Sequence, residues 1–495
     1  MLTFVTLWWL FFWTALGLCV GSFLNAVIYR LPRHGSLRVP RWSACPSCQH
    51  RIHWYDNLPL ISFVLLRGRC RRCGIPIATR YVVIEAGMAI IVLMLLDAFF
   101  IGASRPGHCA SLVGLTEELA WDWPMLFSHI ALFACLLSMS AIDLEHYWVD
   151  IRFTTIATVF GFIMHTLWTP THSREWGRPF DTTSVVALAA LAGVGVTWLL
   201  SACRPQVDPE DFPQPIPPDL NSENETPLNN VNDEIRRTHW YEPPSRAFAW
   251  ISCLVLGLLW CSLFTLEIGH PSLRHAVRAL VPLLLFFVLI VRESTVVRTS
   301  DYEIVEAIEQ ERVFARRMAA KEFLILVPAL VLAVVAFVVM SGGGDFASKV
   351  QSILHAEFPI GRIALFRHWA PLTGFATAAS GFIIAGAVGW TVRIVFTIAF
   401  GKEAFGTGDI HLLAAAGCVA GWPVAVVGFF LAAMLALIGW LMVLPFKRSR
   451  ALPLGPWLSV SFLIVVVFHK AIMQSQLVSS LVSSVQFFLQ TDASR

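Results

Sequence analysis

Charged residues are scarce in this sequence. Asp, Glu, Lys and Arg make up 14% of its 495 residues, whereas hydrophobic residues make up 56%. A soluble fold of this size needs a charged surface, so the composition excludes an ordinary water-soluble protein. The net charge of +3 is also too small to indicate a nucleic-acid partner. We therefore expect the lipid bilayer to be a partner of this chain and nucleic acid not to be one.

The N-terminus lacks the basic stretch that opens a secretory signal peptide. Residues 1–28 carry no Lys or Arg. Their apolar run is also longer than the core of such a signal. We expect this segment to be retained as the first membrane helix.

Apolar stretches recur along the chain, and most are long enough to cross a bilayer. Because an α-helix satisfies its own backbone hydrogen bonds in lipid, each stretch predicts a helix. The tract 410–446 is broken around Gly421 and Pro423, which predicts a hairpin of one short and one long helix. The fold class is therefore an all-α polytopic membrane protein with about 12 transmembrane helices. The other stretches lie near 4–28, 82–101, 125–142, 153–169, 184–202, 248–266, 276–291, 323–341, 371–400 and 456–474.

Arginine is concentrated in one short segment. Residues 29–81 contain ten Arg and a single acid, Asp56. Such basic loops stay on the cytoplasmic side of the membrane. We therefore expect this loop to be cytoplasmic and the N-terminus to lie outside. The basic segments 292–322 and 447–455 fall on the same side when the predicted spans alternate.

A polar segment interrupts the membrane part. Residues 204–246 contain nine Pro, nine acids and four bases, a composition that predicts a disordered cytoplasmic linker over 203–247. The stretch 301–322 has the pattern of an amphipathic helix. The predicted parts are a first helix (1–28), a small cytoplasmic zinc-binding domain (29–81), a membrane segment (82–170), an inserted region with the linker (171–365), a second membrane segment (366–475) and a tail (476–495).

Cys45, Cys48, Cys70 and Cys73 form two C-x-x-C pairs separated by 21 residues. Two residues between thiols let both sulfurs reach one ion from a tight turn, and four thiolates complete a tetrahedral zinc site. Such a closed site is structural, so we expect the zinc ion to hold the loop together. The alternative is a set of free or redox-active cysteines.

Two aspartates lie at the cytoplasmic ends of predicted spans. Asp143 ends one apolar run, and Asp409 closes the sequence Gly406-Thr407-Gly408-Asp409. Two carboxyl groups that share one proton can hydrolyse a peptide bond, because the ionised one activates water and the protonated one donates to the carbonyl oxygen. Gly406 and Gly408 allow an irregular backbone and close approach of an extended substrate. The alternative is that both aspartates are ordinary interfacial residues.

In these residues the sequence resembles the type IV prepilin peptidases, which are bifunctional leader peptidases and N-methyltransferases of bacterial inner membranes. The matching blocks lie in the family's order and cover roughly 1–170 and 365–475. They are 21–25, 27–32, 45–48, 54–60, 66–70, 80–85, 141–143 with Asp150, 401–409 and 452–456.

The resemblance implies that Asp143 and Asp409 are the catalytic pair, and that Gly406 and Gly408 belong to the active-site loop. It implies that the cysteines ligate zinc in a domain associated with methylation. The implied partners are prepilin or pseudopilin precursors, cleaved after a Gly that precedes their apolar helix. S-adenosylmethionine would then methylate the new N-terminal residue. The implied location is the bacterial cytoplasmic (inner) membrane.

The sequence departs from the family pattern in two places. Residues 171–365 have no counterpart and add four predicted spans together with the linker. His411 stands where the family usually has a Lys two positions after the second aspartate. No glycine-rich nucleotide loop is visible, so the sequence does not locate a methyl-donor site.

Alternative functions remain open from the sequence. One is a peptidase without methyltransferase activity, in which the zinc domain only stabilises the protein or recognises the leader. Another is a membrane transporter or scaffold, in which the two aspartates form an ion site. A presenilin-like peptidase shares the GxGD element, but the four-cysteine loop argues against it.

Overall fold

The structure is a computed structural model, and it describes most of the apolar segments of the chain. Most of the predicted linker, residues 203–245, lies outside the described residues, as do 301–314 of the predicted amphipathic helix and much of the tail. The described residues are 2–33, 42–101, 115–146, 149–168, 181–202, 246–265, 271–295, 315–342, 344–354, 356, 370–403, 405–445, 453–476, 478–480 and 484.

Helices make up 84% of the described residues, and no strand is found among them. This confirms the predicted all-α class. The elements are α1 (Leu2–Arg30), η1 (Trp54–Asn57), α2 (Ile61–Leu65), α3 (Arg80–Leu96), η2 (Asp97–Ile101), α4 (Leu115–His146), α5 (Ile151–Leu167), α6 (Asp181–Ala202), α8 (Arg246–Thr265), α9 (Pro271–Ser294), α11 (Ala315–Ser341), α12 (Asp345–Leu354), α13 (Pro371–Phe400), α14 (Thr407–Ala420), α15 (Trp422–Val443), α16 (Gly455–Val467) and α17 (His469–Met473).

Seven of the described helices are long and apolar enough to cross a membrane, and five further apolar helices are shorter. Each corresponds to one of the predicted apolar stretches. The predicted hairpin of 410–446 is α14 and α15, which meet at Gly421 with φ of 87°. An ordinary side chain disfavours that backbone conformation, so glycine allows the sharp turn here. The protein is a multi-pass membrane protein.

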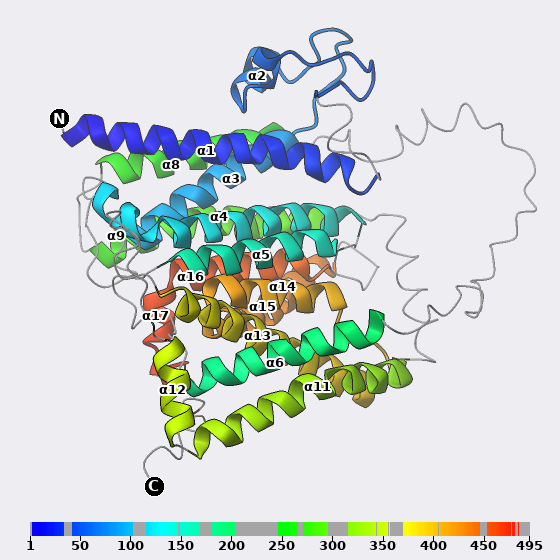
Figure 1. Ribbon diagram of the computed structural model, residues 1–495. Coiled ribbons are helices and arrows are strands. Elements are labelled where there is room, and N and C mark those ends of the chain that lie inside the picture. The colour runs from blue at the N-terminus through cyan, green and yellow to red at the C-terminus, as the bar shows by residue number, and fades with distance from the viewer. Residues whose placement is uncertain are drawn as a thin grey trace, which may run out of the picture.

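The helices run side by side in one stack, with the domain that contains α2 beside α1 and with α11 at the opposite edge (Figure 1). The helices differ in how far their neighbours enclose them. The apolar window of α3 is 94% buried and that of α4 is 78% buried, whereas the window of α11 is only 6% buried. Helix α11 of region 171–365 therefore lies at the edge, whereas α8 and α9 contribute buried residues such as Leu259 and Leu283 to the apolar core.

The inserted helices join this core on two sides. On one side α11 packs against α6 and α13, and on the other α8 packs against α3 while α9 packs against α16. A close contact of small residues joins α6 to α11, where Gly193 lies directly against the backbone of Ala329. The inserted helices thus pack against the core on two sides and do not form a separate bundle.

A buried ionic cluster fixes α9 to the core. The Oδ1 atom of Asp97 accepts a hydrogen bond of 2.9 Å from the Arg278 guanidinium, and its Oδ2 atom lies 2.6 Å from Nδ1 of His275. The other ring nitrogen of His275 is 2.8 Å from the carbonyl oxygen of Val467, and Arg278 also donates to the carbonyl of Ser262. The cluster therefore ties η2, α8, α9 and α16 together. In the sequence these residues are only isolated charges in or near apolar stretches, so the cluster could not be predicted from them as a unit.

Replacing Asp97 by Asn should destabilise the folded protein by about 3 kcal/mol, because it leaves two buried basic groups without their carboxylate. Thermal unfolding of the purified protein in detergent measures this loss. Asp345→Asn is the matched control, since Asp345 is exposed at the start of α12 and its replacement should change little. Equal stability of the Asp97 variant and the wild type would show that the cluster does not hold α9 in place.

Candidate active site and metal centre

Asp143 lies near the C-terminal end of α4 and is only 5% exposed. Its Oδ2 atom accepts a hydrogen bond of 3.0 Å from the backbone N–H of Gly455, the first residue of α16. A Cβ atom on Gly455 would lie 2.7 Å from that oxygen, so a larger residue would displace the carboxylate. Gly455 belongs to the block 452–456, to which the sequence assigned no role. The structure shows that it fixes the orientation of Asp143.

Asp409 lies in the first turn of α14, directly after the loop that links α13 to α14. A Cβ atom on Gly406 would lie 3.3 Å from its Oδ2, and one on Gly408 would lie 2.7 Å from Cβ of Val149. Gly408 thus lets α14 approach the residue that precedes Asp150 and α5. The Oδ1 atom of Asp409 is buried without a hydrogen-bond partner among the described residues. This side chain is therefore available to a further polar group.

The structure brings the two aspartates into one region. Helix α14 contacts both α4 and α5, and α16 contacts α4. The two carboxyl groups interact electrostatically. They come from segments separated by the whole inserted region, and the three glycines that border them leave room around both. The catalytic role of Asp143, Asp409, Gly406 and Gly408 remains a prediction.

Other acidic side chains near the membrane have structural partners. Asp122 accepts a hydrogen bond of 2.7 Å from the Trp168 indole, and Asp150 caps α5 by accepting from the N–H of Arg152. Glu85 of α3 accepts a hydrogen bond of 2.9 Å from the N–H of Leu60 and so joins the membrane core to the four-cysteine domain. These contacts distinguish all three acids from Asp409.

The four cysteines lie on two turns of the same construction. In each turn the first cysteine N–H donates to a residue five positions on, and a residue four positions on donates back to its carbonyl, at distances of 2.8 to 3.0 Å. Those returning residues, Gln49 and Gly74, have positive φ angles of 55° and 72°. A positive φ tightens the chain after the second thiol, so both sulfurs of a pair point to one place.

The four sulfur atoms lie within 4.8 Å of one another, and the Cys45 and Cys73 sulfurs are 3.8 Å apart. A tetrahedral site with zinc–sulfur bonds of about 2.3 Å has sulfur–sulfur edges of about 3.8 Å. No disulfide is formed by these cysteines. The cluster therefore has the ligand number, the ligand type and nearly the dimensions of a structural zinc site, and it could bind a metal.

The thiols differ in acidity in the metal-free protein. Burial raises the pKa of Cys45 to about 12. Hydrogen bonds from the backbone amides of Cys73 and Arg72 lower the pKa of Cys70 to about 7 despite partial burial. Metal ligation requires thiolates, so binding must displace protons from this cluster.

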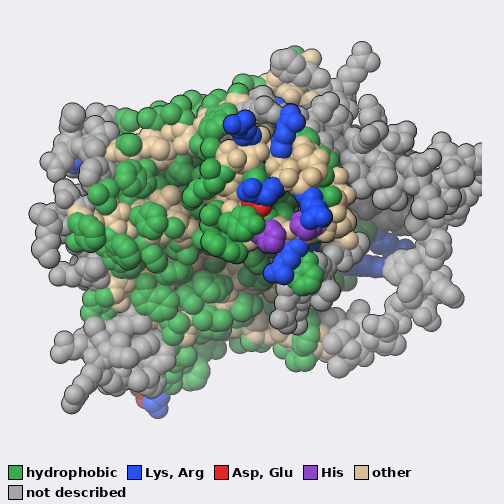
Figure 2. Space-filling model, turned by 90° about the horizontal axis from the view of Figure 1, so that it is seen from above, with side chains coloured by type: hydrophobic (Ala, Val, Ile, Leu, Met, Phe, Trp, Pro, Cys, Tyr) green, Lys and Arg blue, Asp and Glu red, His purple; other side chains and the backbone are tan. Residues whose placement is uncertain are grey.

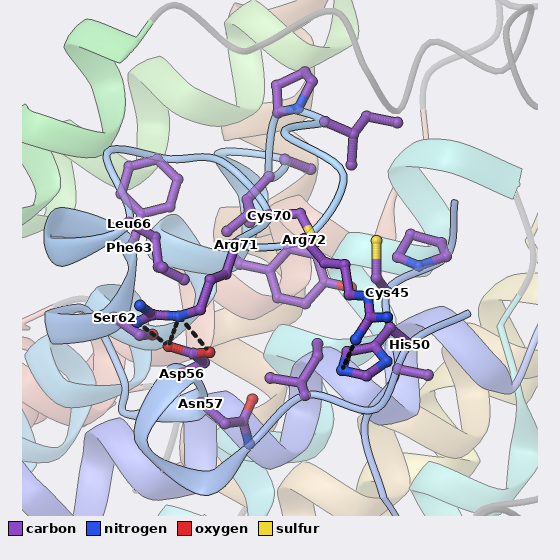
Figure 3. Close-up of a pocket in the computed structure, with 18 of the residues that line it drawn as sticks. Cys45, His50, Asp56, Asn57, Ser62, Phe63, Leu66, Cys70, Arg71 and Arg72 are labelled. Atoms are coloured by element: carbon purple, nitrogen blue, oxygen red, sulfur yellow. Dashed lines mark hydrogen bonds and ion pairs between the residues drawn. The ribbon is translucent and has the colours of Figure 1, made fainter. Parts of the chain in front are cut away.

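A cavity of about 950 Å³ lies beside the cysteines, between the small domain and the ends of α1 and α3. In Figure 3 the Arg71 guanidinium faces Asp56, to which it donates at 2.6 to 3.1 Å, and Arg72 faces His50. The hydrogen bonds from Arg71 lower the pKa of Asp56, which keeps that carboxyl ionised in the wall. Tyr29 and Glu85 line the membrane side of the cavity. Its size is within the range of small-molecule and cofactor sites.

The outer face of the small domain is basic. Figure 2 shows Lys and Arg side chains gathered there around two His side chains, whereas much of the surrounding described surface is hydrophobic. Among the described residues of 29–81, the exposed Arg residues are Arg33, Arg51, Arg67, Arg69, Arg71 and Arg72.

Comparison with known proteins identifies similar sequences. Residues 15–99 match the model of the Bacterial Peptidase A24 N-terminal domain. The chain is 38% identical to a prepilin leader peptidase/N-methyltransferase of Myxococcus xanthus, over 30% of this chain and 38% of that protein. It is 31% identical to one of Burkholderia pseudomallei, over 37% and 58%. It is 36% identical to a type 4 prepilin-like proteins leader peptide-processing enzyme of Escherichia coli, over 28% and 50%.

These matches support a relation of this chain to the type IV prepilin peptidase family. The chain spans about half the length of these curated relatives, with matched shares of 38% to 58%. The family-model match includes all four cysteines and ends well before Asp143. No solved structure matches the chain.

Proposed function

We propose that this chain is an intramembrane aspartic peptidase that removes the leader peptide from prepilin-like precursors and then methylates the new N-terminus. The observation that carries the peptidase proposal is that Asp143 and Asp409, from distant parts of the chain, lie close enough for their carboxyl groups to interact electrostatically. The similarity to prepilin leader peptidase/N-methyltransferases supports the choice of substrate and the second activity.

The chemistry follows from two neighbouring carboxyl groups that share one proton. The ionised carboxylate takes a proton from water, and the water oxygen attacks the carbonyl carbon of the scissile peptide bond. The protonated carboxyl group donates to the carbonyl oxygen as the tetrahedral intermediate forms. Breakage of the carbon–nitrogen bond returns a proton to the departing amine. The Gly455 amide holds the Asp143 carboxylate in place for these steps.

The substrate fits this location for a physical reason. A precursor with an apolar helix next to its leader can lie in the bilayer, leaving the junction at the level of the helix ends that carry the aspartates. We assign this end of the stack, and the basic domain, to the cytoplasmic side of the bacterial inner membrane because of the ten Arg in residues 29–81. The N-terminus then lies outside.

The four-cysteine domain is the proposed site of methylation. Cys45, Cys48, Cys70 and Cys73 would hold a structural zinc ion that fixes the two turns beside the cavity. S-adenosylmethionine, when bound, supplies a methyl group on a sulfonium. The cavity between the domain and the membrane helices has room for such a ligand, and its aromatic and charged lining suits an adenosine and an amino-acid group.

Incubation of the purified protein with a precursor and labelled S-adenosylmethionine tests both activities. We expect a shortened product that carries the label at its new N-terminus. A shortened product without label would overturn the methyltransferase part and leave a peptidase alone. An uncut precursor, with wild-type protein shown to be folded, would overturn the peptidase proposal.

A further inference from the structure

Arg393 is a charged residue inside a membrane-spanning helix. It lies in the apolar helix α13, and its side chain is only 6% exposed. A guanidinium at this depth needs partners, and intramembrane charges are commonly tied to function. A single Arg does not interrupt the apolar stretch 371–400, so the sequence pattern alone does not single out this residue.

The Arg393 side chain contacts two separate parts of the chain. Its Nε and Nη2 atoms donate to the two carboxylate oxygens of Glu322 on α11, each at 2.9 Å. Its Nη1 atom donates to the carboxylate of Glu403 and to the carbonyl oxygen of Phe405. The planar guanidinium therefore joins the inserted helix α11 to the loop between α13 and α14.

That loop leads directly to Asp409. The buried Phe405 ring packs edge-on against Phe429 of α15, with centroids 5.3 Å apart, while its carbonyl is held by Arg393. Gly406 follows as the N-cap residue of α14, and Asp409 lies in the first turn of that helix. The position of the Phe405 carbonyl therefore helps to set where α14 starts.

A second contact joins α11 to the same place. Nε of Arg316 donates to the carbonyl of Ile398 at 3.1 Å, near the end of α13. The guanidinium also lies against Gly401, whose φ of 66° ends that helix. Two residues of an otherwise little-buried helix are thus directed at the segment that precedes the proposed catalytic aspartate.

We propose that Arg393 is a positioning residue for Asp409 and that Glu322 of the inserted helix α11 holds it in place. This rests on the proposed function, because it deepens the role of the same aspartate. Glu322 fixes one edge of the guanidinium, and the opposite edge fixes Glu403 and the Phe405 carbonyl. Without Glu322, the guanidinium keeps its bonds to Glu403 and the Phe405 carbonyl but loses its anchor on α11, and the start of α14 loses one of its supports. Region 171–365 is therefore part of the proposed active-site scaffold.

The kinetic test uses the full-length protein and a cleavable precursor. Glu322→Gln should lower kcat for leader cleavage about tenfold or more with little change in KM, because misplacing a reacting group slows the chemical step. Glu322→Asp, which keeps the charge, should recover part of the rate. Lys321→Gln is the matched control, since Lys321 is the exposed neighbour on the same helix. An unchanged kcat for Glu322→Gln would overturn the proposal.

A double-mutant cycle tests whether the two residues act together. Arg393→Lys keeps the charge but cannot bond Glu322 and the loop at the same time. It should lower kcat by a factor similar to that of Glu322→Gln, and the double variant should be no slower than the slower single variant. Factors that multiply in the double variant would show that the two residues act independently and would contradict the proposal.

Hydrogen exchange gives a readout that does not require activity. In folded Glu322→Gln protein, amides of residues 398–408 should exchange faster than in the wild type, while those of α3 should not change. Unchanged exchange in this segment would overturn the proposed support of α14. If the wild type cleaves no precursor, the proposed function fails, and this measurement still decides whether α11 holds the loop.

Discussion

Asp143→Asn and Asp409→Asn should each lower the rate of precursor cleavage by a factor of about 10³ or more, because neither amide can exchange a proton with water or with the scissile peptide. Both changes nearly preserve the size of the side chain, and the amide oxygen at 143 can still accept from Gly455. The loss should therefore appear in kcat and not in the amount of folded protein. Co-expression with a precursor, followed by separation of the cut and uncut forms, measures it.

Asp122→Asn is the matched control for these variants. Asp122 lies on the same helix as Asp143 and is also buried, but its partner is the Trp168 indole, to which an Asn oxygen can still offer an acceptor. Its cleavage rate should stay close to that of the wild type. Processing at the wild-type rate by either Asp143→Asn or Asp409→Asn would show that the two carboxyl groups are not the catalytic pair. A transporter or scaffold would give that result.

Replacing Cys45 or Cys70 by Ser should remove the metal and collapse the small domain. Structural zinc sites contribute about 10 kcal/mol or more of binding free energy to folding, and three sulfur ligands no longer close the tetrahedron. We expect metal content to fall from about one zinc ion per chain to near zero. Methylation should be lost with it, because the proposed methyl-donor cavity shares its walls with the cysteine turns.

Leader cleavage should be affected much less by these cysteine variants, since both aspartates lie on membrane helices outside the four-cysteine domain. Cys19→Ser, at an exposed cysteine on α1, is the control and should retain metal and both activities. Elemental analysis of the purified protein, with label transfer from S-adenosylmethionine, makes the comparison. Full methylation by a Cys45→Ser protein that contains no metal would contradict the assigned role of the domain.

The membrane helices could be predicted from the sequence because lipid imposes a simple rule. A backbone in hydrocarbon must satisfy its own hydrogen bonds, so an apolar stretch forms a helix whatever surrounds it. The predicted stretch 371–400 is α13, and the break at Gly421 separates α14 from α15. Lengths were harder to predict, because the predicted stretch 456–474 is divided at Phe468 into α16 and α17.

The small elements and the helix neighbours could not be predicted in the same way. Helix α12 and the short helix α2 are not marked by long apolar stretches, and they depend on local turns such as the positive φ of Leu60. No local sequence pattern indicates which helices contact each other. The contact of α9 with α16, and that of α11 with α13, arise from packing between distant segments.

Some features of the candidate site could likewise be predicted from the sequence, and others could not. The cysteine cluster could be predicted because its ligands lie in two local turns with fixed spacing. Asp143 and Asp409 could be selected because acids are scarce in apolar segments and because the GxGD block resembles a known family. The contact of Gly455 with Asp143, and that of Glu322 with Arg393, join residues far apart in the chain. Neither residue in these pairs carries a local pattern that indicates its partner.

The most direct test of the account is the mass of a precursor produced together with the wild-type chain. The precursor should have a short basic leader, a Gly and an apolar helix. Intact-mass spectrometry should then find a product that begins directly after that Gly and that carries one added methyl group. A precursor of unchanged mass, in cells whose membranes contain the folded protein, would contradict the proposed function.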